Sequence, residues 1–305
     1  MIIDLPQTTT GDVARALVQV RDEGGAIALG RVLTLVIDAG DRDPEPAIEA
    51  ANVASREHPC RIIVLCRCGN PEARLDGQIR VGGDAGASEV IVLRAGPDLL
   101  DHADTLITPL LLPDAPIVTW WPNEVPEDPF DHPLGGMAHR RISDTLACRH
   151  PGDSLRQLRE NYRDGDTDLA WTRLTVWRGL LAAALDQPPY ERVTKAVVAG
   201  HDTHPSVTLL VAWLAYALRC PVETELSPDV EGVTQVRLER SSGPVVLDRP
   251  DGRVATLSQP GQPDRTIAMP LRTLTECLAE ELRRLDADEV YGAVLTDGLH
   301  RIGAA

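Results

Sequence analysis

Lysine is almost absent from this sequence: Lys195 is the single lysine among 30 basic residues, and all the others are arginines. Schiff-base catalysis, a pyridoxal phosphate anchor and a phosphate-binding P-loop each require a lysine in a particular setting. Lys195 lies in the run VTKAVVAG, which is typical of a strand, and the chain has no GxxxxGK[ST] motif. We therefore expect an ordinary strand-edge lysine rather than a catalytic one.

Aromatic residues are scarce too, with five Trp, four Tyr and one Phe in 305 residues. The cores must therefore consist mainly of Leu, Val, Ile and Ala. The longest apolar run, LLVAWLAYAL at 209–218, has about half of the roughly 20 residues that a membrane-spanning helix needs. The amino terminus, MIIDLPQTTTGD, lacks the basic region and apolar core of a signal peptide. These features predict a cytoplasmic protein without a membrane segment.

Positive charge is outweighed by negative charge, because 30 Lys+Arg face 46 Asp+Glu and leave a formal net charge of −16. An acidic surface of this kind repels a phosphate backbone, so we expect no nucleic-acid partner. Six cysteines are too few for a disulfide scaffold in a chain of this length. We therefore expect mostly reduced thiols.

Helical and strand patterns alternate along both halves of the chain, which predicts a mixed α/β (α+β) fold. In the first half the patterns predict helices at 13–23, 44–56 and 97–111 and strands at 31–38, 61–66, 75–81, 89–93 and 117–121. In the second half they predict helices at 168–186, 206–218, 271–285 and 288–295, strands at 193–199 and 222–226, and a meander of short strands at 233–267.

The length predicts two domains, since a domain usually has roughly 100 to 200 residues. We place them at 1–150 and 151–305, with natural linkers at the Pro-rich segment 122–133 and the polar segment 159–168. A shift of 160 residues superposes Ala39-Gly40 on Ala199-Gly200 and lays helix on helix and strand on strand. We infer that an internal duplication relates the two domains; the alternative is chance matching of a common β-α-β rhythm.

Three cysteines cluster around one predicted strand, at Cys60, Cys66 and Cys68. Their spacing does not match the C-x2-C knuckles of zinc sites, so we expect no metal. A redox-responsive thiol pair is the functional alternative, because Arg61 and Arg67 could lower a neighbouring thiol pKa. Ordinary, partly buried cysteines remain the simpler interpretation.

The segment 200–206 (GHDTHPS) connects a predicted strand to a predicted helix. A helix amino terminus at such a position can bind an anion, with possible contributions from Lys195, His201, His204 and Ser206. The alternative is a polar loop in which Ser206 or Thr203 caps the helix. The chain has neither a GxSxG nor a helix-opening GxGxxG motif, and no catalytic constellation or cofactor motif emerges.

The tryptophans carry the clearer signal, since Trp120 and Trp121 end an apolar strand and Trp171 and Trp177 flank Arg173. Exposed Trp with Arg is the composition of protein-interface anchors, so these five residues are candidates for a partner-docking surface that they form or support. Buried packing is the alternative, because an aliphatic core with few aromatics needs large fillers.

Several of these segments resemble the glucose-6-phosphate dehydrogenase assembly protein family, OpcA, in its actinobacterial type. The resemblance rests on HPCRIIVL at 58–65, PLLLPDAPIVTWWPNEVP at 109–126, RRISDT at 140–145, DLAWTRLTVWRGLLAAALD at 168–186 and HPSVTLLVAWLA at 204–215. These segments occur in the expected order, and WWP and DLAWTRL are unusual enough to be specific.

This resemblance implies a non-catalytic partner protein without a cofactor. Family members bind glucose-6-phosphate dehydrogenase in the oxidative pentose phosphate pathway and promote its active oligomer or activate it allosterically. Cyanobacterial relatives respond to thioredoxin, but none of the six cysteines can be matched to theirs. The alternative function is a sugar-phosphate- or nucleotide-binding sensor or enzyme that uses the segment 200–206.

Overall fold

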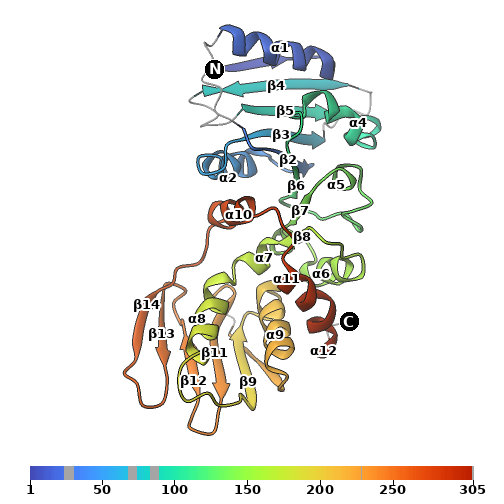
Figure 1. Cartoon of the computed structure of the whole chain (residues 1–305). Helices are drawn as coiled ribbons and strands as arrows, with labels where there is room; N and C mark the ends of the chain where they lie inside the picture. Colours follow the sequence, from blue (N-terminus) through green and yellow to red (C-terminus); the bar gives the residue numbers. More distant parts are fainter. Residues whose placement is uncertain (24–30, 68–73, 83–88, 228, 304–305) are drawn as a thin grey trace. The chain divides into compact units, whose positions relative to one another are not determined.

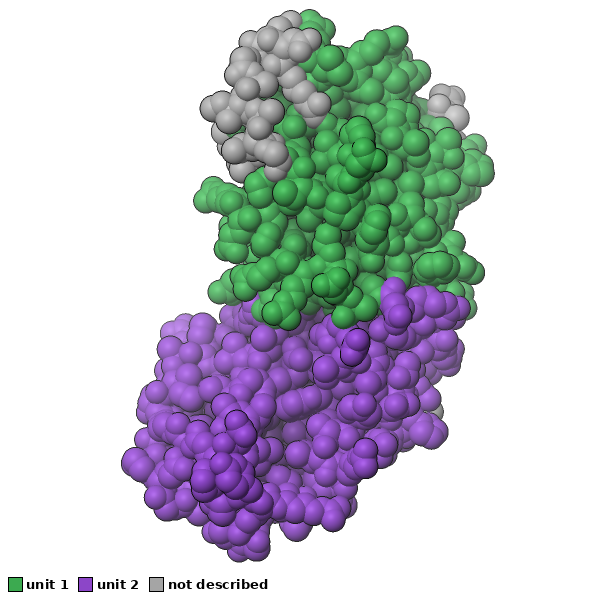
Figure 2. All heavy atoms as spheres, in the orientation of Figure 1, with its two compact units in different colours: residues 1–147, 165–167, 274–287 green, residues 148–164, 168–273, 288–305 purple. Residues whose placement is uncertain are grey.

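The chain folds into two compact units in the computed structural model, which describes residues 1–305 except 24–30, 68–73, 83–88, 228 and 304–305. Unit 1 comprises 1–147, 165–167 and 274–287, and unit 2 comprises 148–164, 168–273 and 288–305 (Figure 2). The chain first passes from unit 1 to unit 2 after residue 147, close to the predicted boundary at 150. The sequence did not predict the two later returns to unit 1.

The sheet of unit 1 has eight strands in the described residues, in the order β1-β4-β5-β3-β2-β6-β7-β8 (Figure 1). Their bounds are β1 (Ile2–Leu5), β2 (Leu33–Gly40), β3 (Cys60–Arg67), β4 (Leu75–Val81), β5 (Glu89–Ala95), β6 (Ile117–Trp121), β7 (Arg140–Ser143) and β8 (Asp166–Asp168). Strands β5, β3, β2, β6 and β7 are parallel, whereas β4 runs antiparallel to β5 and β1 antiparallel to β4. Continuous apolar runs such as CRIIVLC suit parallel strands that are buried on both faces.

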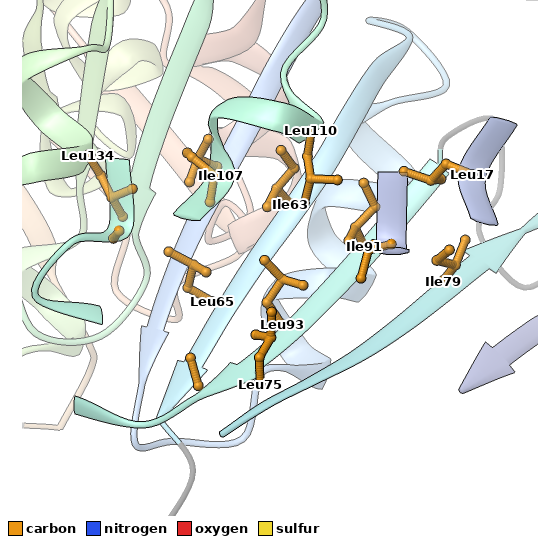
Figure 3. Packing of buried hydrophobic residues seen from close by; sticks show 14 of the residues in the cluster. Leu17, Ile63, Leu65, Leu75, Ile79, Ile91, Leu93, Ile107, Leu110 and Leu134 are labelled. Carbon is orange, nitrogen blue, oxygen red and sulfur yellow. The ribbon is translucent and has the colours of Figure 1, made fainter. Parts of the chain in front are cut away.

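Helices of unit 1 cover this sheet; they are α1 (Thr10–Glu23), α2 (Glu45–Ala54), α3 (Pro97–Leu100), α4 (Ala103–Ile107), α5 (Pro133–Gly136) and α10 (Leu274–Arg283). One apolar cluster joins α1 to the strands and includes Leu17, Ile63 and Leu93 (Figure 3). Trp121 also belongs to this cluster. Each fully buried Leu or Ile side chain contributes roughly 1.5–3 kcal/mol to folding.

The helix predicted at 97–111 is broken into α3, α4 and a 3-10 turn at Thr108–Leu110. His102 leaves helical dihedrals (φ −121°, ψ 41°) between α3 and α4. Pro109 cannot donate a backbone hydrogen bond, so the helix cannot continue regularly through it. The prediction of one long helix was therefore wrong.

The sheet of unit 2 has six strands in the described residues, in the order β10-β9-β11-β12-β13-β14. The strands are β9 (Lys195–Gly200), β10 (Val222–Leu226), β11 (Val233–Glu239), β12 (Val245–Asp248), β13 (Val254–Ser258) and β14 (Arg265–Ala268). β10 runs parallel to β9, and β11 to β14 form the predicted antiparallel meander. The mixed α/β fold class is therefore confirmed in both units.

Helices of unit 2 are α6 (Pro151–Glu160), α7 (Leu169–Thr172), α8 (Thr175–Leu185), α9 (Pro205–Leu218), α11 (Glu289–Ala293) and α12 (Leu299–Arg301), with a π-helical turn at Val294–Gly298. The helix predicted at 168–186 is split between Thr172 and Thr175 into α7 and α8. At its other end, α8 stops at Leu185, as the pattern predicted.

The predicted duplication has a counterpart in the element order. A shift of 160 residues relates α1, β2, α2 and β3 of unit 1 to α7–α8, β9, α9 and β10 of unit 2. In both units the two strands pair directly and in parallel. Common ancestry of the two units remains a hypothesis, because β2 pairs in parallel with β6 whereas β9 pairs antiparallel with β11.

Candidate functional site

The tryptophans of the predicted docking surface are buried. Trp120, Trp121, Trp171 and Trp177 are each at most 2% exposed. The interpretation of these indoles as exposed interface anchors is therefore wrong, and the alternative of large fillers in an aliphatic core is confirmed. Arg173, by contrast, is half-buried and borders the surface. A docking role for the tryptophans can now only be a supporting one.

In unit 2, arginines surround the two tryptophans of α7 and α8. The guanidinium carbon of Arg178 lies 3.7 Å from the ring centre of Trp171, and that of Arg249 lies 5.1 Å from Trp177. The indole N–H of Trp171 donates to the Asp288 carboxylate at 2.9 Å. Each cation-π contact contributes roughly 0.5–2 kcal/mol, depending on desolvation, so these pairs fix the orientation of α7 and α8.

The outer face of α8 is exposed and free of acidic residues. Val176, Gly179, Ala182 and Ala183 are all exposed along TVWRGLLAAAL, and the helix has one charged residue, Arg178. Val176 has 39% of its surface exposed. We call Val176, Gly179 and Ala183, with Arg173 at their amino-terminal end, the α8 face. An apolar surface with arginine at its border matches the composition of protein interfaces.

In unit 1, Trp120 and Trp121 end β6, which lies next to β2, where the order of strand addition along the chain reverses. From β2 the chain proceeds to β3 and β5 on one side and later crosses to β6 and β7 on the other. Open α/β sheets bind ligands at the carboxyl ends of strands at such a switch point. The described loops at this position are therefore the place to test for a cofactor site.

The loop after β2 does not fit a phosphate. Its sequence, GDRDP at 40–44, has one glycine and exposes the carboxylates of Asp41 and Asp43. α2 then begins with Glu45 in its first turn, which puts negative charge where a dinucleotide would place its pyrophosphate. Arg42 binds Glu124 at 3.2 Å, and the Asn123 amide donates to the Ala39 carbonyl at 3.1 Å. These bonds join the loops after β2 and β6.

Asp38 and His132 lie at the same end of the sheet. Burial raises the pKa of the Asp38 carboxyl, and the nearby His132 opposes that shift. Burial also lowers the pKa of His132, with Asp38 acting in the opposite sense. The His132 ring packs edge-on against Trp121 at 5.5 Å, and its Nδ1 accepts the Leu134 N–H at 3.3 Å. His132 therefore serves as the cap of α5 and a packing partner of Trp121.

In unit 2, an anion site was predicted at 200–206, but a side chain of this segment already caps the amino terminus of α9. His204 is the N-cap of α9, and its Nδ1 accepts the Ser206 N–H at 3.2 Å. The Ser206 hydroxyl is buried and donates to the Ala170 carbonyl at 2.7 Å. Lys195 starts β9, at the opposite end from this loop, and pairs with Glu223 at 2.7 Å. The four predicted residues therefore do not converge, and neither Ser206 nor Thr203 is the cap.

His201 and its neighbours do not form a catalytic triad. The Thr203 hydroxyl lies 3.1 Å and the Asp202 carboxylate 3.5 Å from the same ring nitrogen, Nδ1. A catalytic histidine must contact the acid and the nucleophile through different nitrogens. An adjoining cavity of about 670 Å³ carries Arg149 and Arg156 but also Asp153 and Asp202, so its charge is mixed.

Cys66 does not have the character of a redox thiol. Cys60 and Cys66 are buried, and neither forms a disulfide. Burial raises the pKa of the Cys66 thiol to about 11, despite the opposing effect of Arg94. The expectation of a lowered thiol pKa beside Arg61 and Arg67 is therefore wrong for Cys66. Cys68 lies outside the described residues. No group of three or more His, Cys, Asp or Glu that could hold a metal occurs in the part of the chain that the structure describes.

These observations define a class: a two-unit α/β protein in which the candidate sites that we tested, within the described residues, hold structural roles. Family models then match most of the chain. The N-terminal domain of a glucose-6-phosphate dehydrogenase subunit matches residues 51–160, and the corresponding C-terminal domain matches residues 164–295. The chain belongs to the OpcA family of glucose-6-phosphate dehydrogenase assembly proteins, which confirms the resemblance inferred from the sequence.

Curated relatives of the same name occur in cyanobacteria. The OxPP cycle protein OpcA of Synechocystis is 27% identical over 214 residues, which cover 63% of this chain and 45% of the relative. That of Synechococcus elongatus is 27% identical over 194 residues, covering 55% of this chain and 41% of the relative. The chain thus spans less than half the length of these relatives.

Solved structures with a similar arrangement include a UDP-N-acetylglucosamine 3-dehydrogenase from Acidithiobacillus ferrooxidans. It has 10% identity and a TM-score of 0.46, and the match covers 90% of this chain and 98% of that one. A myo-inositol dehydrogenase from Lactobacillus casei gives 9% identity and a TM-score of 0.40, with coverage of 87% and 91%. Values this low support no inference about the activity of this chain. In the described residues, none of the helices has the length and apolar character needed to cross a membrane.

Proposed function

We propose that this protein is a non-catalytic partner that binds glucose-6-phosphate dehydrogenase and promotes its active oligomer. Family membership carries the proposal, since models named for a subunit of that dehydrogenase match both units. The acidic loop after β2 and the self-capped amino terminus of α9 agree with a role without phosphate-bearing substrates. An activator must bind the active state of its target more tightly than the inactive state, and roughly 1–3 kcal/mol of coupling gives a 5- to 150-fold effect.

The experiment is co-purification of the chain with the dehydrogenase from the same organism, followed by activity and oligomer size with and without the chain. We expect a complex, a larger active oligomer and a higher rate. Calorimetry of the isolated chain with glucose 6-phosphate and with NADP separates this function from a sugar-phosphate sensor. Tight binding of either compound, without an effect on the dehydrogenase, contradicts the proposal.

The α8 face is our proposed docking surface, supported from beneath by Trp171 and Trp177. A Val176→Asp variant places a charge on this exposed apolar face, where a surface substitution changes stability by no more than about 0.5 kcal/mol. We expect at least a tenfold loss of affinity for the dehydrogenase, because desolvating an unpaired carboxylate costs several kcal/mol. Binding is measured by calorimetry, alongside a thermal unfolding curve.

The matched control is Val254→Asp, since Val254 lies on β13 and has a similar exposed fraction of 42%. We expect it to bind like the unmodified chain. Equal binding by both variants assigns the docking surface to a different part of the protein.

A further inference from the structure

Strand β10 forms one edge of the sheet in unit 2. Two flanking hydrogen bonds show which of its residues direct their backbone N–H and C=O groups toward β9 and which direct them outward. The Ala196 N–H donates to the Pro221 carbonyl at 3.0 Å, and the Ser227 N–H donates to the Gly200 carbonyl at 2.9 Å. Odd-numbered residues of β10 therefore direct their backbone groups toward β9. Because each residue of a parallel strand directs its N–H and C=O to the same side, Val222, Thr224 and Leu226 direct theirs outward.

This edge is exposed along its length. β10 is the terminal strand of the six, and its residues Glu223 to Leu226 are all exposed. Leu226 has 65% of its surface accessible, which is unusual for a leucine in a strand. A row of outward N–H and C=O groups is a template for one more strand.

A groove follows the same strand on the side of α9. Val222, Thr224 and Leu226 share the sheet face of the buried residues Ala196 and Val198, since they are their register neighbours or continue that series. Two cavities, of about 670 and 270 Å³, lie along this face and share Val211, Thr224 and Ile302 as lining residues. Alternate side chains of an added strand would enter this groove, where small apolar groups fit beside Val211 and Ala215. Arg219 and Arg301 also line the larger cavity, so basic side chains are excluded from this side of the strand.

The opposite face of β10 is acidic. Glu223 pairs with Lys195, whereas Glu225 forms no ion pair among the described residues. A second copy pairing antiparallel about Thr224 would place Glu223 opposite Glu225 in two chains that each carry a net charge of −16. Like charges directly opposite each other destabilise strand pairing, so the charge pattern selects a partner of opposite sign.

We propose that β10 accepts an extended segment of another protein, in which arginine or lysine alternates with small apolar residues. The apolar side chains enter the groove beside α9, and the basic side chains lie over Glu223 and Glu225. β14, the other edge of this sheet, differs because its exposed side chains include Arg265. This proposal rests on the edge strand alone and does not depend on the identity of the dehydrogenase as a partner.

The test uses the full chain and three fluorescein-labelled peptides: GRVRVRVG, its acidic counterpart GEVEVEVG, and a proline-containing version, GRVRPRVG. Fluorescence anisotropy measures affinity at low and at physiological salt. We expect GRVRVRVG to bind and the other two to bind at least tenfold more weakly, because one lacks opposite charge and the other lacks a strand N–H. Equal affinity for the basic and acidic peptides overturns the charge argument.

Thr224→Pro removes an outward N–H of β10 without removing a bond to β9, as edge strands tolerate. The matched control is Thr266→Pro in β14. The Met269 N–H donates to the Arg253 carbonyl, so odd-numbered residues of β14 direct their backbone groups toward β13 and Thr266 directs its own outward. We expect about tenfold weaker binding of GRVRVRVG to the first variant, unchanged binding to the second, and unchanged circular dichroism for both. Equal binding to both variants overturns the proposal.

Light scattering adds a second criterion. A dimer that Thr224→Pro converts to a monomer, while Thr266→Pro does not, overturns the proposal in favour of a second copy as occupant. A Glu225→Arg variant gives the complementary measurement. We expect it to bind the basic peptide more weakly and the acidic peptide more tightly than the unmodified chain does. Unchanged peptide preference in this variant also overturns the proposal.

Discussion

His204 shows how a single residue couples the cap of α9 to pH. Burial, followed by the positive charges of Arg173, His201 and Arg249, lowers the pKa of His204 to about 4. The ring must stay neutral to accept the Ser206 N–H. Because the unfolded chain takes up this proton near the ordinary histidine pKa of 6.5, the native state loses stability as pH falls from about 6.5 to about 4.

A His204→Asn variant tests this at the residue scale. Asparagine keeps a side-chain acceptor at the N-cap but does not titrate. We expect the wild-type chain to lose up to about 3 kcal/mol of unfolding free energy between pH 7 and pH 4 that the variant does not lose. Urea denaturation at several pH values measures the difference. His300→Asn, at an exposed position on α12, is the control and should keep the wild-type slope.

Gly135 determines whether α5 can approach the preceding loop. A Cβ atom at this position would lie 1.6 Å from the Pro129 carbonyl oxygen, a backbone atom that cannot move aside cheaply. We expect Gly135→Ala to cost at least about 3 kcal/mol of unfolding free energy, which is an overpacking cost at the upper end. Chemical denaturation measures it, with Gly152→Ala in α6 as control.

The control position offers open space, since a Cβ atom added at Gly152 would meet no other atom within 4 Å. Alanine there should be neutral or stabilising by up to about 1 kcal/mol, because it reduces the entropy of the unfolded chain. Similar costs at both glycines would show that the loop before α5 yields to the added methyl group.

Elements with strong periodicity or apolar runs were predictable from the sequence, whereas short and charged ones were not. β3, β5, β9 and the meander β11 to β14 lie where the patterns predicted them. β7 was not predicted, because its sequence, RRIS, begins with two arginines, which are rarely buried in a strand. Arg140 is neutralised by Glu281 at 2.6 Å and Arg141 by Asp166, and both partners lie far along the chain.

The candidate site was less predictable than the fold, and for a different reason. The sequence showed tryptophans close to arginines, but it could not show whether those tryptophans are exposed at an interface or buried in the core. The cation-π contacts of Arg178 and Arg249 now account for that pairing inside unit 2. The exposed face of α8 also has a sequence pattern: Val176, Gly179 and Ala183 recur at helical spacing on the side opposite Trp177 and Leu181.

At the scale of the whole molecule, the scarcity of lysine makes the chemistry of the proposed interface testable. With one lysine in the chain, any cationic contact to the dehydrogenase must come almost entirely from arginine, whose planar guanidinium binds carboxylates in a bidentate manner. Lys195 is paired with Glu223 between β9 and β10, whereas Arg173 borders the α8 face. Selective chemical modification can therefore separate the two kinds of cation.

We expect acetylation of Lys195 to leave activation of the dehydrogenase unchanged, because its charge lies outside the proposed docking surface. Modification of arginines with phenylglyoxal should abolish activation, since it blocks bidentate hydrogen bonding by Arg173 at the α8 face. Mass spectrometry identifies the modified positions, and circular dichroism checks that the fold survives. Pre-formation of the complex should protect Arg173 from the reagent. Loss of activation on lysine acetylation, or equal arginine reactivity in the free and bound chain, would contradict docking through the α8 face.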